Sequence, residues 1–141
     1  MNHIEVYDNI LSKEECNKII KYFEDSSWKE RAFIAGSATK EIQPKFKNGS
    51  NVTVRLSNCE KTMYNYLNEF IIPSLGKGLD EYKKKFPFID HGLDAWSIED
   101  AFNIQKFNGK EEGYFIQHCE SSTIGTCKRI LVWMIYLNNA K

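Results

Sequence analysis

An imidazole and a carboxylate stand two residues apart in this 141-residue chain, at His118 and Glu120. If this stretch is an extended strand, both side chains point to the same face, because strand side chains alternate. Such a pair can supply two of the three protein ligands of a 2-His-1-carboxylate Fe(II) site. The spacing is short and common, so the alternative is a surface histidine and glutamate that lie close together by chance.

The segments around the pair follow a defined order. A strand is expected over 102–107, and a polar turn leads from it to Gly113 and Tyr114. After Glu120, a loop of small residues precedes Arg129, which opens an apolar strand expected over 130–138. This order resembles the first half of the catalytic domain of Fe(II)/2-oxoglutarate-dependent dioxygenases of the prolyl 4-hydroxylase type, and is most similar to their short phage-like members.

The resemblance implies a site and its cofactors. His118 and Glu120 would bind Fe(II), although relatives more often carry Asp at the second position. Tyr136 would bond the distal carboxylate of the cosubstrate 2-oxoglutarate, and Tyr114 would line the same pocket. Ascorbate is a further cofactor candidate, and no residue is assigned a separate catalytic role. For Tyr136 the alternative is an aromatic residue at the end of a core strand.

In this family the second iron-binding histidine and a basic residue for 2-oxoglutarate come later in the chain. The histidines here are His3, His91 and His118, and none follows the pair. His91 lies in a loop context and is expected to be structural or exposed. We therefore expect residues 1–141 to form a single oxygenase domain, truncated before the distal histidine, that does not turn over by itself.

The composition limits the other possibilities. Acidic and basic residues balance at 19 each, so there is no electrostatic case for a nucleic-acid partner. No apolar run is long enough to span a bilayer, and the first residues lack the pattern of a signal peptide, which favours a cytoplasmic location. The four cysteines have no C-x-x-C spacing, so neither a zinc site nor a disulfide framework is expected.

Local patterns predict the remaining elements. Ser12 and Glu15 form a capping box that begins a helix. A long helix is expected over 58–86, with a break at Pro73 because proline interrupts helical hydrogen bonding. Strands are expected over the ranges 4–8, 28–35 and 51–56, and the polar loop 36–50 is either a lid over the substrate or an ordinary surface loop.

These elements predict an α+β fold in which helices pack on a β-sandwich, an incomplete double-stranded β-helix or jelly roll. The nearly continuous apolar run over 130–137 predicts a strand buried on both faces. The resemblance implies hydroxylation of a protein or peptide side chain, with proline as the expected acceptor. The alternative is a non-catalytic β-sandwich module that binds a protein partner or assembles into a particle.

Overall fold

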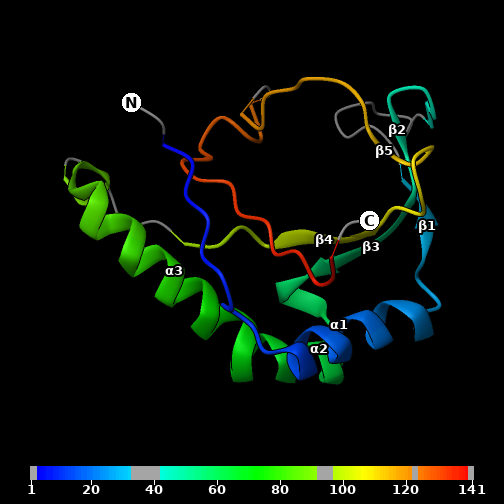
Figure 1. The fold of residues 1–141 in the computed structure, drawn as a ribbon, viewed down its shortest axis with the longest axis horizontal. Helices are drawn as coiled ribbons and strands as arrows, with labels where there is room; N and C mark the ends of the chain where they lie inside the picture. The colour runs from blue at the N-terminus through cyan, green and yellow to red at the C-terminus, as the bar shows by residue number, and fades with distance from the viewer. Residues whose placement is uncertain (1–2, 33–41, 92–96, 122–123, 140–141) are drawn as a thin grey trace. The chain divides into compact units, whose positions relative to one another are not determined.

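The computed structural model describes residues 3–32, 42–91, 97–121 and 124–139 (Figure 1). The chain forms two compact units. The first unit combines Met1–Glu24 with Val54–Phe102, and the second combines Asp25–Thr53 with Asn103–Lys141. The single domain expected over 1–141 stays a prediction. The described residues combine helices with small antiparallel sheets, so the predicted α+β class is confirmed, whereas they form no complete sandwich or jelly roll.

The first unit begins with helix α1 (Lys13–Asp25). The backbone N–H of Ser12 donates to Glu15 Oε2 at 2.7 Å, and the N–H of Glu15 donates back to Ser12 Oγ at 3.2 Å. These two bonds satisfy donors that the first turn of a helix leaves free, so the predicted capping box is confirmed. The helix buries Ile19 and Phe23.

A second, longer helical segment follows in the same unit. It consists of α2 (Lys61–Tyr66), the π-helical turn η2 (Leu67–Ile71) and α3 (Ile72–Lys85), without interruption. The predicted break at Pro73 is therefore wrong. In an α-helix the proline ring would clash with the carbonyl four residues earlier. The π-helical turn changes the backbone hydrogen bonding just before the proline: Ile72 N–H donates to the carbonyl of Leu67, five residues back.

Apolar side chains from these helices form most of the core of the first unit. Met63 is fully buried, and Leu67, Phe70 and Ile71 lie beside it along the helix with at most 5% exposure. Two short 3₁₀ turns border the helical segment, η1 (Leu56–Asn58) and η3 (Pro87–Asp90). Among the described residues, no helix is both long and apolar enough to cross a membrane.

The sheets are short. One has the order β1 (Glu30–Arg31), β3 (Ser50–Arg55) and β4 (Ala101–Lys106), and the other pairs β2 (Lys47–Asn48) with β5 (Gly113–Tyr114). β3 and β4 confirm the strands predicted over 51–56 and 102–107, shifted by one residue. The strand predicted over 28–35 is reduced to β1 in its described part, and residues 4–8 form no strand.

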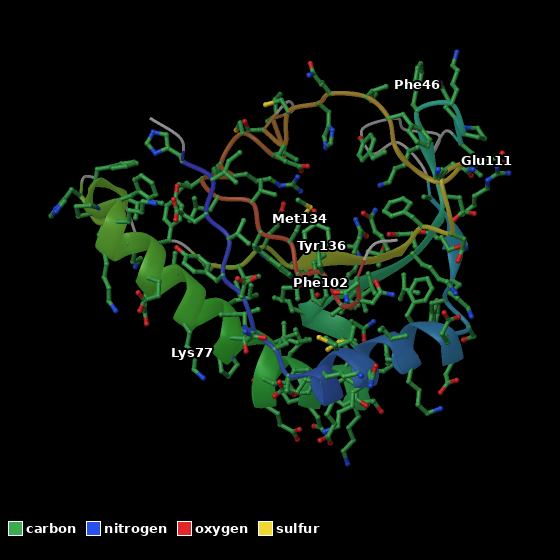
Figure 2. The ribbon with its side chains drawn as sticks, viewed as in Figure 1. Phe46, Lys77, Phe102, Glu111, Met134 and Tyr136 are labelled. Atoms are coloured by element: carbon green, nitrogen blue, oxygen red, sulfur yellow. The ribbon has the colours of Figure 1, made fainter. Side chains whose placement is uncertain are left out.

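The strand predicted over 130–138 is wrong. This segment has no regular structure, and its side chains are largely exposed, with Val132, Met134 and Tyr136 at 58%, 74% and 78%. Figure 2 labels Met134 and Tyr136 on this part of the chain, which has no strand arrow. A strand forms only where a neighbour accepts its backbone hydrogen bonds, and no described strand pairs with this segment.

Candidate functional site

The candidate site lies in the second unit and begins at the two-stranded ribbon of β2 and β5. The ribbon is antiparallel, with Lys47 opposite Tyr114 and Asn48 opposite Gly113. A further backbone bond extends the pairing, since Phe115 N–H donates to the carbonyl of Phe46 at 2.8 Å. The ribbon therefore fixes Tyr114 at the point where the chain leaves β5 toward His118.

A tight turn at Gly49 separates β2 from β3. Gly49 has φ +152°, and a Cβ atom there would lie 2.7 Å from Phe107 Cδ1 and 2.8 Å from the carbonyl oxygen of Lys106. No side chain fits this space, so the turn requires glycine. Part of the predicted lid over 36–50 is thus β2 and this turn, while residues 36–41 lie outside the described residues.

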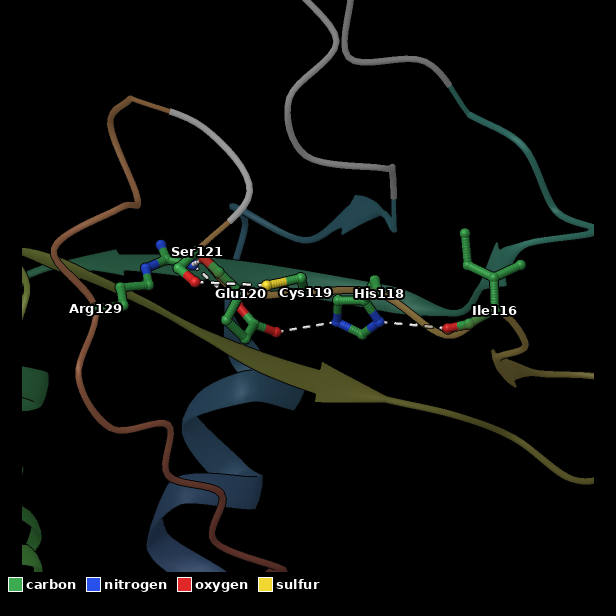
Figure 3. Close-up of polar contacts among 6 residues, drawn as sticks. All are labelled: Ile116, His118, Cys119, Glu120, Ser121 and Arg129. Atoms are coloured by element: carbon green, nitrogen blue, oxygen red, sulfur yellow. Dashed lines mark hydrogen bonds and ion pairs between the residues drawn. The ribbon is translucent and has the colours of Figure 1, made fainter.

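Three contacts hold the His118 ring, and Figure 3 shows the two polar ones. It stacks on Tyr114 with ring centroids 4.1 Å apart and an angle of 16° between the planes. Its Nδ1 lies 3.3 Å from the carbonyl oxygen of Ile116, and its Nε2 lies 3.0 Å from Glu120 Oε1. The predicted strand through His118 is not formed, because β5 ends at Tyr114. The histidine and the glutamate nevertheless face each other as predicted.

The second carboxylate oxygen of Glu120 is also occupied. Arg129 Nη1 lies 2.9 Å from Glu120 Oε2 and donates as well to the backbone carbonyl of Glu120 at 3.2 Å. Arg129 therefore orients the carboxylate. The Glu120 side chain is 41% exposed, so water screens this ion pair and it adds little stability.

The two ring nitrogens of His118 can each donate or accept, and the tautomer decides which contact is a hydrogen bond. With the proton on Nε2, the ring donates to Glu120 Oε1 at 3.0 Å, an ordinary hydrogen bond. With the proton on Nδ1, the ring donates to the Ile116 carbonyl, and the Nε2 lone pair is directed toward Glu120 and is available to a metal cation.

The same distance suits a metal ion. Ligands about 2.1 Å from one ion and at right angles to each other lie about 3.0 Å apart. Nitrogen and carboxylate oxygen are suitable ligands for Fe(II), and a metal-bound histidine commonly donates its other N–H to a backbone carbonyl. The described residues, however, contain no group of three His, Cys, Asp or Glu side chains that could hold a metal. His118 and Glu120 thus fit two positions of an iron site.

The two predicted cosubstrate residues differ in their surroundings. Tyr114 belongs to the site, and its pKa is raised by burial and by the negative charge of Glu120. Tyr136 is mostly exposed, and no hydrogen bond or ring contact among the described residues joins it to the pair. His91 is exposed, as expected, and Cys119 contacts Ser121 at 3.4 Å, a hydrogen bond that lowers the pKa of the thiol.

Lys47 is a site residue that the sequence pattern did not reveal. Its side chain is buried, with 9% of the residue exposed, and its Nζ lies 4.9 Å from the centre of the Tyr114 ring. Burial lowers the pKa of this amine, and the negative charge of Glu120 opposes that effect. A lysine in a polar, lysine-containing loop gives no sequence signal, because its position depends on pairing with the distant β5.

Comparison with protein-family models, with curated proteins and with solved structures found no match to this chain.

Proposed function

We propose that His118 and Glu120 bind Fe(II) in a 2-oxoglutarate-dependent oxygenase that hydroxylates a protein or peptide side chain, with proline as the expected acceptor. The observation that carries the proposal is the 3.0 Å separation of His118 Nε2 and Glu120 Oε1, which equals the spacing of two adjacent ligands of one metal ion. When bound, the iron supplies the activation of O2 that protein side chains cannot provide.

The residues around the pair have distinct roles in this proposal. The Ile116 carbonyl accepts from Nδ1 and so directs the Nε2 lone pair of His118 toward the iron position. Arg129 holds one oxygen of Glu120 and leaves the other facing His118. Tyr114 covers one face of the imidazole and excludes water from it. Tyr136 would bind 2-oxoglutarate, a proposal that rests on the family resemblance, as do ascorbate and the jelly-roll completion of the sheets. The proposed cytoplasmic location rests on the first residues, which lack the pattern of a signal peptide.

Metal titration of the purified chain tests the proposal directly. Fe(II) is added under anaerobic conditions, and Co(II) in a parallel series, with binding followed by calorimetry and by the Co(II) absorption spectrum. His118→Ala and Glu120→Gln should each weaken binding by at least about tenfold. His91→Ala is the matched control, because His91 is exposed and lies in the other unit. Equal metal binding by the wild type and the three variants would show that neither His118 nor Glu120 is a ligand.

The second candidate function is a non-catalytic module that binds a protein partner. The exposed apolar side chains of the segment 130–136 favour it, as does the absence of a third ligand among the described residues. On this view the proton, and not a metal, bridges His118 and Glu120. A chain that binds neither Fe(II) nor Co(II) in the titration, while remaining folded by circular dichroism, would favour the module.

A further inference from the structure

We propose that Lys47 is a positioning residue of the site: its ammonium group holds the Tyr114 ring, which in turn holds the His118 imidazole toward Glu120. The inference rests on the proposed metal site for its purpose, but the stacked arrangement can be tested without any metal. It assigns a role to a residue far from the His118 pair in sequence.

Two contacts to the Tyr114 ring make up the arrangement. The Lys47 ammonium lies over the Tyr114 ring, 4.9 Å from its centre, and the His118 ring stacks on Tyr114 at 4.1 Å. The backbone fixes the first contact, since Lys47 and Tyr114 are directly opposite in the β2–β5 ribbon. Side chains directly opposite each other on antiparallel strands are close enough to interact. His118 follows after a short connection and has no strand to hold it.

Two physical effects give Lys47 this role. An ammonium group is attracted to the face of an aromatic ring, and the attraction grows when water is excluded from both groups. Lys47 is 9% exposed, so little water separates its ammonium group from the ring. The ammonium group lies over the Tyr114 ring, and the negative charge of Glu120 also acts on it.

A neighbouring lysine provides the matched control. Lys45 lies two residues earlier, is exposed, and places its Nζ 4.7 Å from the centre of the Phe46 ring. Lys45→Met therefore removes the same charge and the same type of contact from the same segment. Lys47→Met should differ from it only if the stack on His118 matters. Lys47→Arg keeps a cation over the ring and should preserve the arrangement.

The first experiment records the ring-proton chemical shifts of His118 by NMR in the metal-free protein at one fixed pH. Stacking on Tyr114 moves these protons upfield, and Tyr114→Leu defines the shift without the ring. Lys47→Met should move the shift toward the Tyr114→Leu value, whereas Lys45→Met and Lys47→Arg should leave it unchanged. A His118 shift that is the same in Lys47→Met as in the wild type overturns the proposal.

The second experiment repeats the Co(II) titration on the same variants. Lys47→Met should weaken binding by about tenfold, the effect expected of a residue that orients a ligand, and Lys47→Arg should restore it. If the wild type binds no metal, the proposed function fails while the NMR result still decides the role of Lys47. If Lys47→Met does not fold, Tyr114→Leu takes its place: an unchanged His118 shift in that variant shows that the stack is absent and overturns the proposal.

Discussion

Shortening Glu120 by one methylene group is a sharp test of the site geometry. Glu120→Asp keeps the charge but withdraws the carboxylate by about 1.5 Å, the length of one carbon–carbon bond. The present contacts are 3.0 Å to His118 and 2.9 Å to Arg129, so each can lengthen to about 4.5 Å, beyond hydrogen-bond range. A metal ion with bonds of about 2.1 Å cannot join two ligands that far apart and at right angles.

We therefore expect Glu120→Asp to weaken Co(II) binding by at least about tenfold, close to the effect of Glu120→Gln. The free energy of unfolding should change by less than about 1 kcal/mol, because both contacts of Glu120 are partly exposed and screened by water. Calorimetric titration measures the first quantity, and urea unfolding followed by circular dichroism measures the second.

Glu111→Asp is the control for this substitution, since Glu111 lies in the same unit and its side chain is exposed. It should leave both quantities unchanged. The prediction has particular interest because the family that the sequence resembles more often carries aspartate here. Wild-type metal affinity in Glu120→Asp would refute the reasoning, because it would show that the backbone, and not the side-chain length, sets the distance to His118.

The further predictions concern the free energy of unfolding, measured by urea unfolding. Met63→Ala should cost about 2–5 kcal/mol, because Met63 is fully buried among the helices of its unit. Gly76→Ala should raise the free energy of unfolding by about 0.5–1 kcal/mol, since a Cβ at this helical position meets nothing within 4 Å. Gly109→Ala should lower it by about 1 kcal/mol, because the backbone there has φ +70°. Ser12→Ala should cost about 1 kcal/mol through loss of the cap. Hydrogen bonding from Ser12 lowers the pKa of Glu15 below its usual value of 4.5, so the ionised Glu15 side chain stabilises the fold fully above pH 4.5. As the pH falls below 4.5, the wild type should lose its stability advantage over Glu15→Gln.

Local features of the fold were predictable from the sequence. The capping box at Ser12 and the strands β3 and β4 depend on neighbouring residues and on alternation, which the sequence displays directly. His118 and Glu120 were predicted to share one face of a strand, and they are in contact although no strand forms there. Their closeness in the sequence keeps the two side chains near each other without a partner strand.

Features that depend on distant partners were not predictable in the same way. The apolar run over 130–137 shows hydrophobicity, but burial also requires neighbouring strands, and the sequence does not identify them. Lys47 became a site residue only through its pairing with Tyr114, which joins two distant parts of the chain. Arg129 was expected only at the start of a strand, since its bond to Glu120 depends on the path of the intervening loop.

The π-helical turn η2 determines how this sequence would align with that of a homologous chain of different length. A π turn holds one residue more than an α turn, so Leu67–Ile71 accommodates an additional residue without rotating α3 by the 100° that an insertion in a plain α-helix would cause. Met63 and Ser74 therefore stay on the buried side of one continuous helix. A homologous chain with a plain helix should be one residue shorter in this turn, and its buried positions would then align again on both sides of the gap.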